Sequence, residues 1–201
     1  RIALGYTWFP GQVVMQAGVD MTYRLYGDQP LIAKPAAGQP YFKSDKRVDM
    51  IKNVSLRATR TFKPLQLSGV ARISLLSSTQ NSYDSARSKY IPDYYSYVEY
   101  GLAPALSFVL KDGTQFGFTL DWRRLSYAGR FKQDAAGNYG SSKIHQTVWL
   151  NSLSARYPLG KKFFGRGIYN YQVSSSNMRY EANYRYNYRA STYLLGVEWE
   201  F

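Results

Sequence analysis

The sequence ends in the stretch YLLGVEWEF, residues 193–201, in which every second side chain is aromatic or aliphatic. Successive residues of a β-strand point to opposite faces, so residues at every second position share one face. The apolar face of this stretch comprises Tyr193, Leu195, Val197, Trp199 and Phe201. The opposite face carries Gly196, Glu198 and Glu200. The stretch is therefore predicted to be a strand with one face suited to lipid and the other to water.

The same alternation recurs through the rest of the chain. The clearest case is residues 13–25, where apolar residues alternate in strict register with a mostly polar set. Strands of soluble proteins are rarely that long. Nine strands are predicted in all, and the others lie at residues 2–8, 48–62, 65–75, 98–110, 116–122, 144–159, 162–174 and 193–201. The sequence therefore predicts an all-β fold.

Two of these strands are irregular. Pro104 lies inside the strand 98–110, where it has no N–H to donate to the ladder, so a bulge or a local gap in pairing is expected. In the strand 144–159, placing Trp149 and Leu153 on the apolar face also sends Asn151 there and turns Val148 to the polar face. The apolar face of this strand is therefore expected to include one amide.

The connections alternate between short turns and long polar loops. Turns are predicted at residues 9–12, 63–64, 111–114 and 158–161, and loops at 27–46, 77–93, 128–143 and 175–190. No linker or shift of composition interrupts this pattern. The sequence therefore predicts one domain, residues 1–201, folded as an antiparallel up-and-down meander.

Composition agrees with a protein that crosses a membrane with strands. Aromatic residues make up 17% of the 201 residues, yet no apolar run reaches the length of about 18 residues that a transmembrane helix needs. Membrane-spanning strands need only about 9–11 residues and interleave apolar with polar side chains. The absence of cysteine is compatible with export without disulfides.

The aromatic ending on Phe201 and the alternation of short turns with long loops resemble the outer-membrane β-barrels of Gram-negative bacteria. The resemblance implies a transmembrane β-barrel in the bacterial outer membrane, with the short turns on the periplasmic side. It also implies that the alternating residues of the last strand form the signal read by the barrel-assembly machinery. These residues are Tyr193, Leu195, Val197, Trp199 and Phe201.

A closed bacterial barrel normally has an even number of strands, whereas nine are predicted here. We therefore expect at least one further strand before Arg1, in a longer protein. A miscount, or a first segment that lies inside the barrel, is the alternative.

The end of the chain carries a second resemblance. Ser176-Asn177, followed by Tyr180, Tyr184, Tyr186 and Arg189 before the last strand, resembles the closing hairpin of barrels that follow periplasmic tetratricopeptide repeats. Surface lipoprotein assembly modifiers and polysaccharide-export porins are of this type. The resemblance implies a barrel that serves export.

Charged residues alternate with the apolar ones, so they are predicted to face the lumen of the barrel. The lumen-lining candidates are Asp20, Arg24, Arg57, Arg72, Glu99, Asp121, Arg123, Arg156 and Arg166. Cationic rings of this kind favour anionic solutes in a water-filled passage. The alternative, which we favour for any single arginine, is that arginines and carboxylates pair across a narrow interior.

The chain has 26 Lys and Arg against 13 Asp and Glu, and the excess falls mainly in the predicted loops. Such a belt would attract lipopolysaccharide phosphates or an acidic polysaccharide; the alternative is a solvated belt with no fixed partner. Tyr180, Tyr184 and Tyr186 are expected to extend the last two strands above the membrane rather than to stack on nucleic acid. The belt comprises Lys34, Lys43, Lys46, Arg47, Arg87, Lys89, Arg130, Lys132, Lys143, Arg179, Arg185 and Arg189.

No catalytic residue, metal site or cofactor is predicted. His145, the only histidine, is placed at the outer rim, and no serine shares its face within two residues, although Ser141 would share it four residues away. No cluster of His, Cys, Asp and Glu has the spacing of metal ligands.

Two functions follow. The first is transport or export across the outer membrane, of an anionic solute, a polymer or a lipoprotein. The second is a structural or binding barrel whose basic, tyrosine-rich outer loops engage lipopolysaccharide or a protein. Expected partners are outer-membrane lipid, lipopolysaccharide and the barrel-assembly machinery, with a protein partner or oligomer left open and nucleic acid excluded. A soluble ligand-binding barrel is a third alternative, and it would turn the apolar residues inward.

Overall fold

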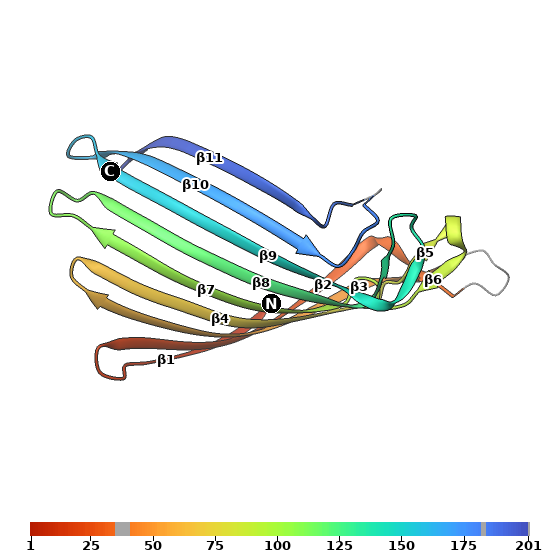
Figure 1. The fold of residues 1–201 in the computed structure, drawn as a ribbon. Helices are drawn as coiled ribbons and strands as arrows, with labels where there is room; N and C mark the ends of the chain where they lie inside the picture. The colour runs from red at the N-terminus through yellow and green to blue at the C-terminus, as the bar shows by residue number, and fades with distance from the viewer. Residues whose placement is uncertain (35–40, 182–183, 201) are drawn as a thin grey trace.

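The computed structural model describes residues 1–34, 41–181 and 184–200, and its fold is nearly all antiparallel sheet (Figure 1). Phe201, the last residue of the predicted closing strand, lies outside the described residues. The strands are β1 (Ile2–Trp8), β2 (Val13–Ala33), β3 (Tyr41–Phe62), β4 (Leu65–Ser78), β5 (Ser82–Asp84), β6 (Lys89–Ile91), β7 (Tyr97–Val109), β8 (Gln115–Gln133), β9 (Tyr139–Pro158), β10 (Phe163–Ser176) and β11 (Tyr188–Trp199). A short 3-10 helix, η1 (Ser85–Arg87), separates β5 from β6. Among the described residues, no helix has the length and hydrophobicity to span a membrane.

The nine predicted strands are all present and form one sheet in the order β1-β2-β3-β4-β7-β8-β9-β10-β11. All neighbouring strands are antiparallel. β5 and β6 form a separate hairpin within the connection from β4 to β7. Figure 1 shows the short turns gathered at one end of the sheet and the long connections, with β5 and β6, at the other. The antiparallel meander is therefore confirmed, and β1 and β11 are the edges of the described sheet.

Two of the predicted loops are shorter than expected, because the strands continue past the end of the apolar alternation. β2 runs to Ala33 and β3 begins at Tyr41, so only a few residues remain of the predicted loop 27–46, of which 35–40 lie outside the described residues. β8 runs to Gln133 and β9 begins at Tyr139, which overturns most of the predicted loop 128–143. Backbone hydrogen bonding does not depend on apolar side chains, so a polar hairpin can continue the ladder.

The two predicted irregularities have clear outcomes. Leu102 pairs with Trp122 and Ala105 with Thr119, but the residues between them on β7, including Pro104, are not paired in the ladder with β8. The expected gap at Pro104 is confirmed, and the register on either side is unchanged, so no bulge forms. On β9, Trp149 is exposed while Val148 is buried, which confirms the predicted phase of this strand.

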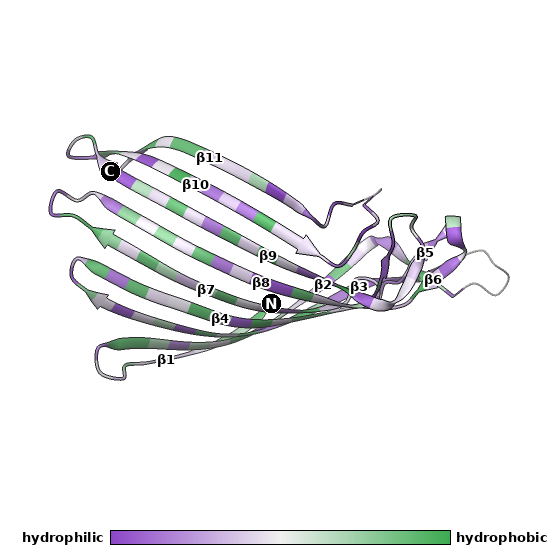
Figure 2. Cartoon of the chain, viewed as in Figure 1, coloured by the Kyte–Doolittle hydropathy of each residue, from purple (hydrophilic) through white to green (hydrophobic). Residues whose placement is uncertain are grey.

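Most apolar side chains of the sheet are exposed, and the buried core is small. Figure 2 shows hydrophobic and hydrophilic residues alternating along the strands. One buried cluster, of Ile144, Met178 and Tyr186, lies near the long connections, with Tyr127 and Tyr180 packed against it. The sheet itself therefore has no apolar core between two layers.

Candidate functional site

The register assigns each side chain to one of two faces. Residues directly opposite each other on antiparallel strands point to the same face. Arg72 of β4 is opposite Gly101 of β7, and Gly101 is opposite Arg123 of β8. Followed across every strand, the register places all the lumen-lining candidates on this one face, which we call the charged face: Asp20, Arg24, Arg57, Arg72, Glu99, Asp121, Arg123, Arg156 and Arg166.

An ion-pair cluster on the charged face joins β4, β7 and β8. The guanidinium of Arg72 donates to Asp121 with an Nη2 to Oδ1 distance of 2.8 Å, and its Nε lies 3.5 Å from Glu99 Oε1. Arg123 Nε lies 3.6 Å from the same Asp121. β7 runs between β4 and β8, so the Arg72 side chain must cross it to reach Asp121. Side chains from strands about 10 Å apart meet in this way when the sheet curves toward the face that carries them.

Gly101 makes this crossing sterically feasible. A Cβ atom on Gly101 would lie 2.7 Å from Arg72 Nε and 2.8 Å from Arg72 Cγ. Any larger residue at this position would displace the guanidinium. Gly101 could not be singled out from the sequence, because its role depends on a side chain from another strand.

A second cluster lies near the turn between β9 and β10. Arg156 Nε donates to Glu198 Oε2 at 3.2 Å, and the guanidinium also contacts Glu200. Its Cζ lies 3.3 Å from the centre of the Phe164 ring, in a cation–π arrangement. Arg156 thus crosses β10 as Arg72 crosses β7, which indicates the same curvature at this edge.

Three other arginines of the charged face are not neutralised. Arg24, Arg57 and Arg166 form no ion pair with a carboxylate of the described residues. Arg24 is opposite Asp49, but Asp49 is 2% exposed and is held by Arg47 at 2.6 Å. The expected pairing therefore holds for Arg72, Arg123 and Arg156, while the other three leave net positive charge on this face.

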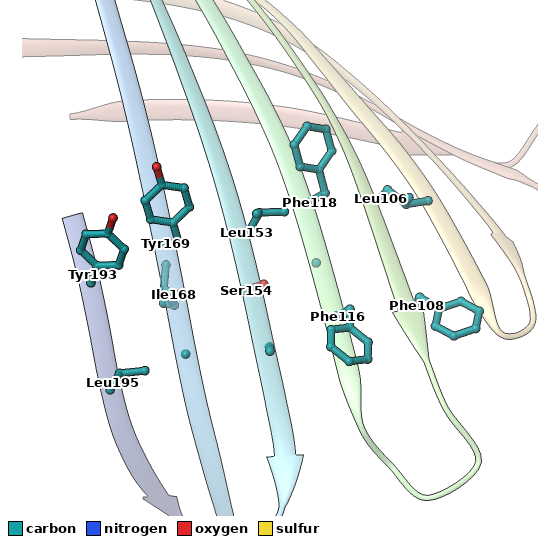
Figure 3. Close-up of a pocket in the computed structure, with 13 residues that line it drawn as sticks. Leu106, Phe108, Phe116, Phe118, Leu153, Ser154, Ile168, Tyr169, Tyr193 and Leu195 are labelled. Carbon is teal, nitrogen blue, oxygen red and sulfur yellow. The ribbon is translucent and has the colours of Figure 1, made fainter. Parts of the chain in front are cut away.

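The opposite face, which we call the apolar face, is exposed. Leu4 is 75% exposed, and Leu195 is 87% exposed although it lies in the middle of a strand. Figure 3 shows side chains from β7 to β11 around a hollow of about 500 Å³. Most of them lie on the apolar face, whereas Ser154 and Ile168 lie on the charged face. The described members of the predicted assembly signal, Tyr193, Leu195, Val197 and Trp199, all lie on the apolar face.

The apolar face forms a belt that runs obliquely across the strands. Ile73 of β4 is opposite Tyr100 of β7, but Tyr100 is opposite Arg124 of β8. A single row of residues opposite one another thus changes from apolar to charged between β7 and β8. The edge of the belt nearest the long connections therefore runs at an angle to these rows. Strands that are tilted relative to a barrel axis produce this pattern.

The connection from β4 to β7, the tip of the β8–β9 hairpin and the connection from β10 to β11 pack together into a compact group, which we call the loop cluster. Arg130 Cζ lies 4.3 Å from the ring centres of both Tyr94 and Tyr127, and Arg130 Nε donates to the carbonyl of Tyr94 at 2.9 Å. A Cβ on Gly129 would clash with the backbone of Pro92. Tyr127 lies on the charged face, so the segment before β7 folds over this face at its loop-side end.

Four cations of the predicted basic belt belong to the loop cluster. Arg47 lies 4.2 Å from the Tyr95 ring centre, Arg87 5.2 Å from that of Tyr180, and Lys89 3.9 Å from that of Tyr139. These cations and Arg130 are packed against aromatic rings of distant segments. Lys34, Lys43, Lys46, Lys132, Lys143, Arg179, Arg185 and Arg189 have no ring contact among the described residues.

The tyrosines near the end of the chain also differ from the prediction. Only Tyr188 belongs to a strand, as the first residue of β11, whereas Tyr180, Tyr184 and Tyr186 lie between β10 and β11. Tyr186 is buried, and its hydroxyl accepts a hydrogen bond from Arg130 at 3.3 Å. These three tyrosines therefore belong to the connection between β10 and β11 and do not extend either strand.

His145 makes only backbone hydrogen bonds among the described residues. Its N–H donates to Asn177, and its carbonyl accepts from Ser176 Oγ at 2.7 Å. Within the described residues, no group of three or more His, Cys, Asp and Glu side chains could hold a metal ion.

Comparison of this chain with protein-family models, with curated proteins and with solved structures gives no match.

Proposed function

We propose that this chain forms an integral β-barrel of a Gram-negative outer membrane, acting in transport or export of an anionic solute or polymer. The observation that carries the proposal is the polarity of the sheet. Its apolar face is exposed, whereas charged side chains converge on the face toward which the sheet curves. In water such a large exposed apolar surface is unfavourable, at roughly 25 cal/mol per Å². In a bilayer the same surface contacts lipid.

Strand length and tilt support the membrane assignment. The apolar residues of β2 extend from Val13 to Leu25, somewhat longer than the 9–11 residues or so that a tilted strand needs to cross a bilayer. The oblique limit of the apolar belt agrees with tilted strands. The soluble barrel is disfavoured, because its apolar residues would face a closed interior.

Cysteine accessibility tests the two faces directly. The chain has no cysteine, so single-cysteine variants can be labelled without background. Ser55 and Leu56 are adjacent on β3 and lie on the charged and the apolar face, respectively. In outer membranes of cells that express the protein, Ser55→Cys should react with a small membrane-impermeant maleimide, and Leu56→Cys should remain unlabelled. Equal labelling of the two variants in intact membranes would refute the lipid-facing assignment.

Planar-bilayer recording tests the passage. An open barrel should conduct ions, with a reversal potential in a KCl gradient displaced toward that of chloride. The unpaired Arg24, Arg57 and Arg166 are the reason for this expected anion preference. A barrel that stays closed at all voltages would rule out the open pore and leave the second function.

The second function, a barrel that binds a partner through its loops, is favoured by the loop cluster. Its segments pack over the loop-side end of the charged face, as the contact between Gly129 and Pro92 indicates. A narrowed entrance with ordered tyrosines is better suited to recognition than a set of solvated loops.

A further inference from the structure

We propose that the loop cluster contains a binding site for a neutral saccharide. The proposal deepens the second function above, binding by the loops, and does not require that the barrel conducts. The site is a hollow of about 360 Å³ between the β5–β6 hairpin, the tip of the β8–β9 hairpin and the connection from β10 to β11. This volume is at the lower end of the range for small-molecule pockets, about 300–1,000 Å³.

Aromatic rings form much of the lining. The wall includes Tyr94, Tyr139, Tyr180 and Tyr186, which come from three separate segments of the chain. A tyrosine offers a flat apolar face and a polar hydroxyl at its tip. A pyranose ring has matching properties, because its C–H groups form an apolar face and its hydroxyls lie around the edge.

One ion pair supplies the charged groups of the lining, beside the polar side chains of Ser82, Ser85 and Gln133. Arg87 Nη1 lies 3.4 Å from Asp84 Oδ2, and Arg87 Nη2 donates to the carbonyl of Ala136 at 3.2 Å. The hydroxyl of Tyr139 donates to Asp84 Oδ2 at 2.9 Å. Both charged groups are thus held in place before any ligand arrives, which lowers the entropic cost of binding.

The pairing determines the class of ligand. Asp84 repels an anion such as a phosphate, and Arg87 repels a cation, so the pair favours a ligand without charge. A guanidinium has five N–H donors, and the two hydrogen bonds above occupy only part of them. The pair can therefore donate to and accept from neighbouring hydroxyls, the arrangement that a neutral sugar presents.

Gly137 leaves room for the Arg87 side chain. Its φ is +86°, and a Cβ at this position would clash with the Arg87 guanidinium. The turn at the tip of the β8–β9 hairpin thus leaves space for the cation.

Saturation-transfer-difference NMR on the protein in detergent micelles tests the site. The probes are glucose, galactose, mannose and N-acetylglucosamine, with their β- and α-linked disaccharides, at millimolar concentration. When the aromatic protons of the protein are saturated, at least one of these saccharides should show a saturation-transfer signal. Arg87→Gln should weaken its binding by about tenfold, because a hydrogen bond to a charged group is lost. Tyr180→Leu should weaken it too, whereas Tyr157→Leu on the exposed apolar face should not change it.

Three results would overturn the proposal: no probe binds, Arg87→Gln and Tyr180→Leu both leave binding unchanged, or glucuronate or inorganic phosphate binds more tightly than the neutral probes. The fold of each variant is checked by far-UV circular dichroism, and Asp84→Asn provides a second disruption of the pair that keeps the size of the side chain. Competition by purified lipopolysaccharide would assign the sugar to that source, and its absence would assign it to a free saccharide. Cysteine labelling of Ser55→Cys and Leu56→Cys separates failure of this site from failure of the membrane assignment.

Discussion

At the scale of single residues, Gly101 shows how one small position shapes the charged face. It lies between Arg72 and Arg123 in one row of the sheet, and the guanidinium of Arg72 passes over it. Asp121 then accepts from Arg72 and lies close to Arg123. The absence of a side chain at residue 101 thus allows three charged residues to meet.

We therefore expect Gly101→Val to destabilise the protein by about 1–3 kcal/mol, the usual cost of overpacking. The measurement is urea unfolding of the protein in lipid vesicles. Gly69→Val is the matched control, since a Cβ at residue 69 would have no described atom of another segment within 4 Å. Equal destabilisation by the two variants would show that the space above Gly101 is not needed by Arg72.

Tyr127, in the loop cluster beyond the limit of the apolar belt, gives a prediction on pH dependence. Burial raises the pKa of Tyr127 to about 12, although the nearby Arg130 acts in the opposite direction. An unfolded tyrosine has a pKa of about 10, so the folded loop cluster favours the neutral phenol. Its contribution to stability is complete below pH 10 or so and is lost as the pH rises through about 12.

We expect alkaline titration, followed by tyrosinate absorbance, to show a late phase that decreases in Tyr127→Phe. The phenylalanine ring keeps the contact with Arg130 and removes only the ionising hydroxyl. An unchanged late phase in this variant would contradict the assignment of the raised pKa to Tyr127.

At the scale of elements, each strand carries two environments that alternate with every residue. β7 illustrates this: Leu102 is exposed on the apolar face, whereas Ala103 points to the charged face. The gap at Pro104 leaves this alternation intact, because the register with β8 is the same on both sides.

Arginine substitution on β7 is expected to separate the two environments. If the apolar face contacts lipid as proposed, Leu102→Arg should destabilise the protein by about 2–4 kcal/mol, the cost of an arginine on a lipid-exposed face near the bilayer midplane. Ala103→Arg, one residue further along and on the opposite face, should cost much less. Equilibrium unfolding of both variants in vesicles of the same lipid provides the comparison, and a smaller cost for Leu102→Arg than for Ala103→Arg would contradict the proposed orientation.

At the scale of the whole molecule, the charged face is a mixture of neutralised and unneutralised arginines. Arg72, Arg123 and Arg156 share four carboxylates, while Arg24, Arg57 and Arg166 have none among the described residues. The unpaired arginines lie on β2, β3 and β10, so their charge is spread over the sheet. In the proposed barrel, the resulting field would favour anions.

Arg57→Gln is therefore expected to reduce the preference for chloride over potassium, measured as the reversal potential in a KCl gradient. Arg60→Gln is the matched control, because Arg60 lies on β3 but on the opposite face. The shift should be smaller at high salt, since screening weakens the field of a solvent-exposed charge. An identical shift in the two variants would mean that the charged face does not line the passage.

The periodicity of the sequence was sufficient to predict the nine strands, their order as a meander and the face of each charged candidate. Alternation along a strand depends only on local backbone geometry, so Trp149 and Val148 could be assigned to opposite faces despite the amide of Asn151. The loop lengths were wrong at 27–46 and 128–143, because polar hairpins continue the backbone ladder without any apolar signal.

The two-faced sheet follows from the amino-acid sequence alone, since a period of two residues fixes which side chains share a face. The folded structure was needed to establish which arginines are neutralised, why Gly101 must be small, and how Arg87, Asp84 and the surrounding tyrosines enclose a hollow. These features depend on contacts between distant residues, such as Arg72 with Asp121 and Arg87 with Ala136, each pair 49 positions apart. Sheet curvature and loop packing bring such residues together, and neither leaves a periodic signal in the chain.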